Sequence, residues 1–499
     1  MENLFAALQM ILTPDVILWI ALGMSLGILV GAIPGLTATM AVSLLLSITY
    51  GMDVTHALAV LIAVYLGGIY GGSRSAILLN VPGTPSSAAT SLDGFPLAKK
   101  GQATVASLLA TTGSMIGGLI GVVILAVAAP VVASFALKFA AWEYFWLGIF
   151  GIVIAANLSE GNLIKGLLGG MLGLLITTIG MDPIYGGVRL VFGNRNLVGG
   201  VSMLPAMIGL FGMAEVFCSL SENVTTDTVL KKDTKEKSSL FRDLIKAFKL
   251  NFSMPRNVLV SSVIGTFIGA VPGVGPDIAS WVAYDTEKRS NKNKEEFGKG
   301  SFAGLLASET ANNAATSGVF IPLLTLGIPG CAVSAVILGG MRLHGLRPGP
   351  TFFIDQGELI YYIIGILILS NLLILILGTI YTKPLSKVVS VPYGIIMPFV
   401  AVFAVIGSYA MSYRVFDIII MFAFGIIGYV LRKADVPSSP LVLSLILGNI
   451  IESNFRRGLI VSETFAIFFT RPISLALVIL MVVIVGYPVL KRMYLTKKN

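Results

Sequence analysis

Residues 269–278 read "GAVPGVGPDI", and residues 31–40 carry the related stretch "GAIPGLTATM". Both begin with Gly-Ala, an aliphatic residue and Pro-Gly, and they stand 238 positions apart (269 − 31). Proline followed by glycine interrupts regular secondary structure, yet both copies lie within apolar sequence. The pattern therefore predicts that the backbone breaks at corresponding places in two halves of the chain.

Composition places the chain among membrane proteins. Of its 499 residues, 56% are hydrophobic and only 12% are charged, against about 25% charged in soluble domains. Apolar runs of about 20 residues, the length that crosses a bilayer as a helix, recur along the chain, as at 118–137. A transmembrane β-barrel would need short alternating segments instead. We therefore expect an all-α polytopic membrane protein in contact with the lipid bilayer.

Two basic segments indicate the orientation of the chain. Residues 221–256 contain eight Lys/Arg and residues 284–300 contain five, and loops of this kind stay in the cytoplasm. Because Lys and Arg fall mostly in a few short polar loops such as these, the net charge of +9 does not point to nucleic acid. We interpret 221–256 as a basic cytoplasmic linker between a first transmembrane repeat, 1–220, and a second, 257–499.

The segment 257–283 lies between the two basic loops and holds only 27 residues. A single crossing would put one loop on the wrong side, and two crossings need about 40 residues. We therefore predict a re-entrant hairpin that enters from the cytoplasm and turns at Pro272-Gly273. Such irregular backbone is tolerated at membrane depth only where it is buried in protein or lines a wet cavity. The first copy predicts a second hairpin entering from outside, although 1–33 could instead be one plain spanning helix.

Counting crossings onward from the hairpins gives the second half an inverted topology. One broken crossing ends at Lys99-Lys100, and the other covers 301–349. Further spans are expected at 103–133, 139–158, 163–180, 198–220, 357–381, 390–411, 415–431, 437–452 and 462–490. This order leaves the C-terminus in the cytoplasm, as its basic residues favour. The first residues lack a basic region and a cleavage site, so no cleaved signal peptide is expected.

A second pair of breaks falls in the two broken crossings. Pro82-Gly83 in the first half corresponds to Pro329-Gly330 in the second, 247 positions later (329 − 82). Matched interruptions in inverted halves indicate the site of a secondary transporter, because half-helix N-termini attract anions and unwound carbonyls coordinate Na⁺. The predicted substrate- and ion-binding residues, with no ligand set defined for Na⁺, are Pro34, Gly35, Thr37, Thr39, Asn80, Pro82, Gly83, Thr84, Ser86, Pro272, Gly273, Gly275, Asp277, Asn312, Asn313, Thr325, Pro329 and Gly330.

Ionisable residues near the breaks are further candidates, since charges at membrane depth are rare and usually functional. Asp277 and Glu309 could each bind a cation or carry a proton, and Asp277 could instead cap a helix N-terminus. Arg74 could hold an anionic substrate or pair with an acid inside the protein. Cys218 and Cys331 stand in apolar sequence and are expected to be structural residues, because two cysteines make no disulfide framework.

The sequence lacks the motifs of an enzyme or an ATP-driven motor. It contains no G-x-x-x-x-G-K-[ST] loop, no H-E-x-x-H and no dinucleotide fingerprint, so we expect no catalysis, no cofactor and energy from an ion gradient or another subunit. The leading hypothesis is an ion-coupled importer of organic anions. A passive channel or facilitator would use the same breaks, whereas a membrane scaffold for the 221–256 loop would not need them.

In these motifs the chain resembles TctA, the large membrane subunit of the bacterial tripartite tricarboxylate transporters. The likeness covers essentially the whole chain. The residues that carry it are "GAIPGLTATMAVSLLLSITYGMD" (31–53), "YLGGIYGGSRSAILLNVPGTPSSAATSLDGFPLAKKGQA" (65–103), "GAVPGVGPDIASW" (269–281), "ETANNAATSGVFIPLLTLGIPG" (309–330) and "LHGLRPGP" (343–350).

The resemblance implies a permease of the bacterial inner (cytoplasmic) membrane that works with a small four-helix membrane subunit and a periplasmic substrate-binding protein. Substrates in that family are carboxylates such as citrate and other di- or tricarboxylates, imported by symport with Na⁺ or H⁺. By fold analogy with the ion-transporter superfamily, an elevator-like movement and a homodimer are expected. The resemblance does not say which carboxylate is carried.

Overall fold

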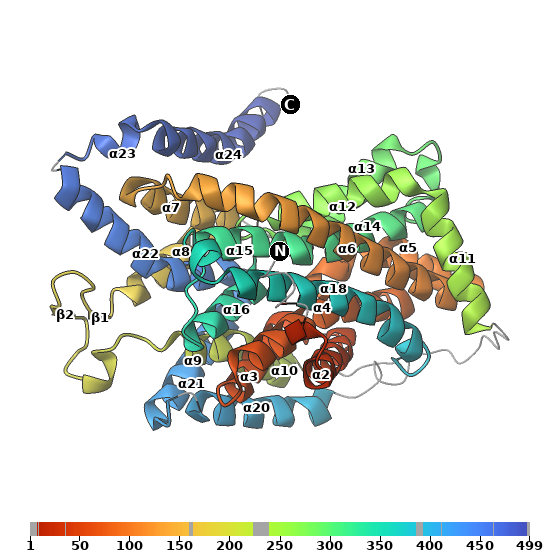
Figure 1. Ribbon diagram of the computed structural model, residues 1–499, viewed down its shortest axis with the longest axis horizontal. Helices are drawn as coiled ribbons and strands as arrows, with labels where there is room; N and C mark the ends of the chain where they lie inside the picture. The colour runs from red at the N-terminus through yellow and green to blue at the C-terminus, as the bar shows by residue number, and fades with distance from the viewer. Residues whose placement is uncertain are drawn as a thin grey trace.

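The computed structural model describes residues 7, 9–34, 36–158, 163–222, 239–385, 393–410, 412–462 and 464–496, and nearly all of its regular structure is helical (Figure 1). In the first half the helices are α2 (Pro14–Ala32), α3 (Ala38–Thr49), α4 (Val54–Leu79), η1 (Pro85–Ser87), α5 (Ala88–Leu97), η2 (Ala98–Gln102), α6 (Ala103–Ala136), α7 (Ala141–Leu158), α8 (Leu163–Thr177), η3 (Arg195–Leu197), α9 (Met203–Ile208), η4 (Gly209–Met213) and α10 (Ala214–Glu222).

The remaining helices are α11 (Leu240–Ser253), α12 (Pro255–Gly269), α13 (Gly275–Ser290), η5 (Lys294–Glu296), α14 (Phe302–Gly318), α15 (Phe320–Leu326), α16 (Ala332–Leu343), α17 (Phe352–Asp355), α18 (Gly357–Tyr381), α20 (Tyr393–Ala410), α21 (Val415–Lys433), α22 (Ser438–Ser462), α23 (Ile467–Thr470) and α24 (Pro472–Thr496). A small antiparallel pair, β1 (Gly180–Met181) and β2 (Val188–Arg189), lies in the loop after α8. The sequence did not predict this pair of strands, nor the amphipathic helix α11 inside the linker.

The helices confirm a multi-pass membrane protein. Six helical segments in the described part of the chain are long and apolar enough to cross a bilayer: 14–32, 54–79, 85–136, 203–221, 357–381 and 415–433. The predicted span 357–381 coincides with α18, and 163–180 with α8 to within three residues. Because α2 alone reaches this length, the alternative of a plain N-terminal spanning helix stays open beside the predicted first hairpin.

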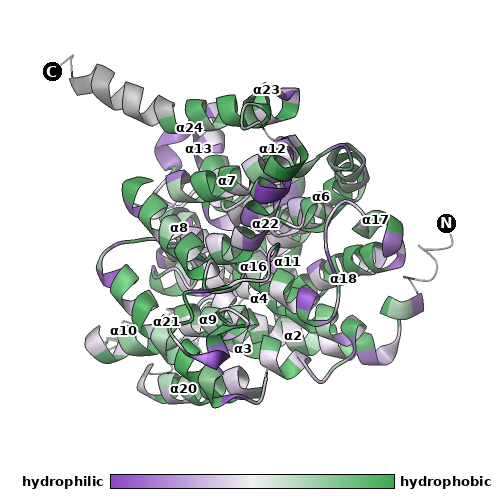
Figure 2. Cartoon of the chain, turned by 90° about the vertical axis from the view of Figure 1, so that its left-hand side faces the viewer, coloured by the Kyte–Doolittle hydropathy of each residue, from purple (hydrophilic) through white to green (hydrophobic). Residues whose placement is uncertain are grey.

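The outer faces of the helices carry apolar stripes that would be unfavourable in water. On α6, Val123, Val127 and Val131 recur at every fourth position and are each more than 60% exposed, which is the spacing of one helix face. In Figure 2 the residues of α7 and α8 are likewise mostly coloured as hydrophobic. Ser, Thr and Asn side chains are instead buried inside the bundle. Exposed apolar faces around a partly polar interior suit a lipid environment.

The two halves of the chain interlock. In the first half α2 packs on α4, and in the second α12 packs on α14. Each half also contributes a helix to the other, since α6 packs on α14 while α18 packs on α4. Likewise α22 packs on α7 and α8, and α21 packs on α9 and η4. Figure 1 shows the resulting arrangement. Helices α11 to α14 lie at one end of the molecule beside α6, whereas α8 and α22 lie toward the opposite end.

The second pair of breaks has the same backbone design in both halves. Asn80 ends α4 in the left-handed conformation with φ 60°, and Gly327 ends α15 with φ 68°, again 247 positions later (327 − 80). After each break a serine turns the next helix. The Thr84 N–H donates to Ser87 Oγ at 3.3 Å, and the Cys331 N–H donates to Ser334 Oγ at 2.9 Å.

The breaks of each half pack directly on one another through glycine. A Cβ on Gly83 would lie well inside 3.0 Å of the Gly31 carbonyl oxygen, and a Cβ on Gly330 would meet the Gly269 carbonyl oxygen at 2.6 Å. Each half therefore joins its "GA-x-PG" stretch to its second Pro-Gly break by the same contact. In the second half the chain turns between α12 and α13, which pack together, and Gly273 there has φ +82°. This is the local geometry of a hairpin, and its entry from the cytoplasm stays a prediction.

Candidate functional site

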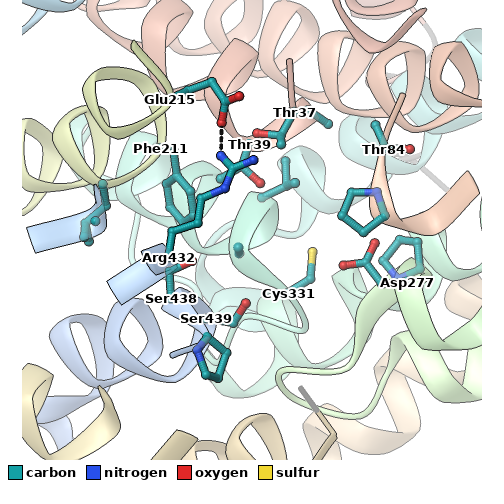
Figure 3. Close-up of a pocket in the computed structure, with 18 of the residues that line it drawn as sticks. Thr37, Thr39, Thr84, Phe211, Glu215, Asp277, Cys331, Arg432, Ser438 and Ser439 are labelled. Atoms are coloured by element: carbon teal, nitrogen blue, oxygen red, sulfur yellow. Dashed lines mark hydrogen bonds and ion pairs between the residues drawn. The ribbon is translucent and has the colours of Figure 1, made fainter. Parts of the chain in front are cut away.

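One cavity of about 700 Å³ is bordered by all four predicted break regions. These regions come from both halves of the chain and are far apart in sequence, as Figure 3 shows for the side chains that surround the space. The break residues that line it are Thr37, Ala38, Thr39, Pro82, Gly83, Thr84, Pro85, Gly273, Val274, Pro276, Asp277, Cys331, Ala332 and Val333. A cavity of this size lies within the usual range for small-molecule sites.

The N-termini of several helices border this cavity. Thr37 caps α3, with its Oγ1 accepting from the Met40 N–H at 3.1 Å. Cys331 caps α16, where the Ser334 N–H donates to its Sγ at 3.5 Å. Val274 precedes α13, Thr84 precedes η1, and Ser438 begins α22. Because the first N–H groups of an α-helix lack partners within it and carry partial positive charge, the ends of α3, α13, α16 and α22 favour a negatively charged ligand.

Charged side chains occupy two opposite walls of the cavity. Asp277 lies on one wall, on the same side as Thr84, and the ion pair between Glu215 and Arg432 lies across from it (Figure 3). Asp277 stands in the first turn of α13, whose N-cap residue is Val274, so the predicted alternative of Asp277 as an N-cap is wrong. A carboxylate beside sites for an anion is the arrangement expected if a cation binds there as well.

The structure divides the predicted binding residues into two groups. Seven line the cavity: Thr37, Thr39, Pro82, Gly83, Thr84, Gly273 and Asp277. The others in the described part of the chain stand away from its lining: Pro34, Asn80, Ser86, Pro272, Gly275, Asn312, Asn313, Thr325, Pro329 and Gly330. Gly35 lies outside the described residues. Asn80 is exposed at the end of α4, so its contribution to the break is the left-handed backbone rather than a side-chain ligand.

Behind the break of the first half, α14 buries a cluster of polar side chains. The Glu309 carboxylate accepts hydrogen bonds from Thr90 and from Ser114 Oγ at 3.1 Å, and Asn313 Nδ2 donates to Ser114 Oγ at 2.7 Å. Both amide atoms of Asn312 are buried without a hydrogen-bond partner among the residues that the structure describes. Since each buried unsatisfied polar group costs about 1–3 kcal/mol, this cluster has spare capacity for water or an ion.

Arg74 is a buried residue of α4 and does not line the cavity. Its guanidinium donates to the Ser107 carbonyl at 2.8 Å, to Thr111 Oγ1 at 2.7 Å and to the Tyr70 hydroxyl. These bonds tie α4 to α6. The arrangement favours a structural role for Arg74, in which its guanidinium is held by neutral hydrogen-bond acceptors instead of a carboxylate.

The sequence missed several lining residues and misjudged one. Cys331 was expected to be purely structural, but it is only half-buried and its side chain faces the cavity, because it follows the break directly; Cys218 is buried as predicted. Phe211, Glu215 and Arg432 come from helices without a Pro-Gly break, so no local signal marked them. The missed residues Ser438 and Ser439 belong to the stretch "VPSSP" (436–440), whose prolines could have indicated a further helix start.

The chain is similar to one known protein family and to two proteins of Agrobacterium vitis. The model of the tripartite tricarboxylate transporter TctA family matches residues 17–443. An uncharacterized 52.8 kDa protein in the TAR-I ttuC' 3' region of Agrobacterium vitis is 37% identical over 477 residues, which cover 95% of this chain and 93% of that protein. An uncharacterized protein in the TAR-II ttuC' 3' region of the same organism is 39% identical over 214 residues, 43% of this chain and 88% of that protein. No solved structure matches.

Proposed function

Because the chain belongs to the tripartite tricarboxylate transporter TctA family, we propose that it is the membrane permease subunit of a binding-protein-dependent secondary transporter that imports an organic carboxylate. Its partners are a small four-helix membrane subunit and a periplasmic substrate-binding protein, in the bacterial inner membrane. The observation that carries the proposal is the single cavity on which all four breaks converge.

Electrostatics supports a carboxylate as the substrate. Each α-helix N-terminus stabilises a nearby anion by about 0.3–2 kcal/mol, and the ends of α3, α13, α16 and α22 border the same space. The hydroxyls of Thr37, Thr39 and Thr84 can complete the hydrogen bonds of a carboxylate. A di- or tricarboxylate presents several such groups, and a ring of helix ends can bind more than one of them at once.

The coupling ion, Na⁺ or H⁺, is proposed to act at the same breaks. Asp277 supplies a carboxylate at the cavity wall, where it can bind Na⁺ or a proton while helix ends hold the substrate. The buried Glu309 and Asn312 offer a second position close behind α5 and η1, since α14 packs on both elements. Binding of cation and anion together lowers the charge that must cross the membrane, which supports symport.

The recurrence of the glycine contacts in both halves supports an inverted repeat. In that arrangement the four break regions would move together as one rigid body, while the remaining helices (the outer helices) stay fixed in the membrane. This is the elevator-like movement that we propose. A homodimer would hold the outer helices in place during that movement. These proposals rest on the fold analogy given above and on the repeated packing of α2–α4 and α12–α14.

Uptake in proteoliposomes tests the function. The chain, its four-helix subunit and its binding protein are reconstituted, and labelled citrate and other di- and tricarboxylates are offered under an imposed Na⁺ or proton gradient. We expect accumulation beyond equilibrium for at least one carboxylate and one gradient. Uptake that only reaches equilibrium under both gradients would establish the alternative, a passive facilitator.

A pair of glycine variants links transport to the breaks. Gly273→Val adds a branched side chain at φ +82° next to Ala155 and should abolish uptake. Gly187→Val lies in the loop between α8 and α9 (residues 178–202), which is predicted to be outside (the outer loop), with no neighbour near its Cβ position, and should leave uptake unchanged. Undiminished uptake by Gly273→Val would favour the scaffold hypothesis for the 221–256 loop.

A further inference from the structure

A second cavity, of about 340 Å³, lies at the far ends of helices that border the first. Along α16, Val333 lines the first cavity and Arg342 lines the second; along α22, Ser438 lines the first and Asn449 the second. The segment from α9 to α10 likewise borders both. Nine residues of helix from Val333 to Arg342 span roughly 14 Å. The two cavities therefore lie in line along one set of helices.

Arg342 gives this second cavity an uncompensated positive charge. It is the only ionisable side chain among the described lining residues, and no carboxylate in the described part of the chain pairs with it. Close by, Arg189 bonds Glu452 at 2.5 Å and Arg456 of α22 bonds Asp182 at 2.5 Å, whereas Arg195 is exposed and does not line the cavity. Arg342 is exposed and takes no part in these ion pairs.

We propose that this second cavity is an anion-binding vestibule, in which Arg342 attracts the carboxylate substrate before it enters the first cavity. The inference rests on the proposed function, because the predicted order of crossings puts this end of α16 on the side where the binding protein delivers substrate. Asn449 adds an exposed amide as a hydrogen-bond donor. Between the cavities α16 is fully buried from Val333 to Met341, so the substrate passes only when the helices move.

A simpler role for Arg342 has to be separated from this one. Arg342 stands in the last turn of α16, where a cation is stabilised by the helix dipole wherever its guanidinium points. That role predicts a change in stability when Arg342 is replaced but no anion preference in the cavity. The two roles therefore differ in a local electrostatic measurement that does not depend on transport.

Cysteine modification provides that measurement. In a full-length chain with Cys218→Ser and Cys331→Ser, purified in detergent, Asn449→Cys is modified by an anionic methanethiosulfonate carrying a sulfonate and by a cationic one carrying a trimethylammonium group. We expect Arg342→Gln to lower the anionic-to-cationic rate ratio about tenfold, because one unit charge acts oppositely on the two reagents, and Arg342→Lys to preserve it. Asn196→Cys, an exposed position of the same outer loop that does not line the cavity, is the control whose ratio should not change.

Citrate serves as the probe for the ligand class. Citrate should slow modification of Asn449→Cys, glucose should not, and Arg342→Gln should remove the protection. In proteoliposomes containing the three subunits, Arg342→Gln should raise the KM for carboxylate uptake several-fold with little change in kcat, and added salt should shrink that difference.

Each outcome decides one point. An unchanged rate ratio in Arg342→Gln, or citrate protection that survives this substitution, overturns the vestibule. A lowered ratio with an unaltered KM overturns its part in delivery. If the ratio and the protection behave as expected while wild-type protein accumulates no carboxylate under any gradient, the vestibule stands and the proposed import function fails.

Discussion

At Gly83, the Pro82-Gly83 break packs tightly against the "GAIPG" stretch that begins at Gly31. The Cβ position of Gly83 lies against the Gly31 carbonyl oxygen and the Ser75 Oγ, and backbone cannot give way as a flexible side chain can. We expect Gly83→Ala to destabilise the protein by about 1–3 kcal/mol, the usual cost of overpacking, and to reduce uptake strongly.

The matched control is Gly187→Ala, whose Cβ position has no neighbour within 4 Å. Thermal unfolding in detergent and uptake in proteoliposomes measure both variants. A Gly83→Ala protein with the melting temperature and uptake of the Gly187→Ala protein would mean that the contact with Gly31 is not tight.

Asp182 makes the loop between α8 and α9 (residues 178–202) sensitive to acid. Backbone N–H groups of Tyr185 and Ile184 hold the pKa of its carboxyl below the ordinary value of 3.8, and Arg456 and Arg189 lower that pKa further. A carboxylate with a depressed pKa in the folded state stabilises the fold above its ordinary pKa, and this contribution is lost as the pH falls through the folded pKa.

We therefore expect Asp182→Asn to lower the melting temperature at about pH 6 and to make no difference in strong acid, where wild-type Asp182 is also protonated. Asp435→Asn is the control, because the Asp435 side chain is 89% exposed. Melting temperatures measured as a function of pH give the result. A destabilisation of Asp182→Asn that stays constant at all pH values would contradict the assignment.

At the scale of elements, Asp93 of α5 holds the connection between α13 and α14. Its Oδ1 accepts the backbone N–H groups of Gly298, Gly300 and Ser301 at 2.9, 2.8 and 2.8 Å. We expect Asp93→Ala to cost about 3 kcal/mol, the scale of one or two hydrogen bonds to a charged group.

Amide hydrogen exchange should locate that loss at 298–301. Asp285→Ala is the matched control, because Asp285 pairs with Arg289 on an exposed helix face, where an ion pair contributes little. Equal exchange at 298–301 in Asp93→Ala and wild-type protein would show that other contacts fix this connection.

The sequence could predict the elements better than the site. Apolar length located α18 to the residue, and Pro-Gly pairs located the four breaks, because both signals are local. The cavity also needs residues that are brought in by packing between the halves, such as Phe211 and Arg432, and no local pattern carries that information. Asn312 is the opposite case: its polar side chain led to the prediction that it binds substrate or ion, yet it is buried in α14 and does not line the cavity.

At the scale of the whole molecule, orientation in the membrane remains the main prediction. The crossing order puts Asp53 outside and Asn293 in the cytoplasm, and Asp435 on the same side as Asn293. Single cysteines at these three positions, treated in intact cells with a membrane-impermeant reagent, should label at 53 only. Labelling of 53 and 293 from the same side would refute the inverted arrangement.

The glycine contacts between the breaks also limit how the gene can vary. Every single-base change at the first or second position of a glycine codon creates a stop codon or a residue that carries a Cβ. At Gly31, Gly83, Gly269 and Gly330 that Cβ meets a backbone oxygen within 3.0 Å, so every missense change reached by one base places an atom against fixed backbone. A saturation mutagenesis library selected for growth on the transported carboxylate should lose variants at these four codons and keep them at Gly51 and Gly187, where the neighbouring space is open and φ is not positive.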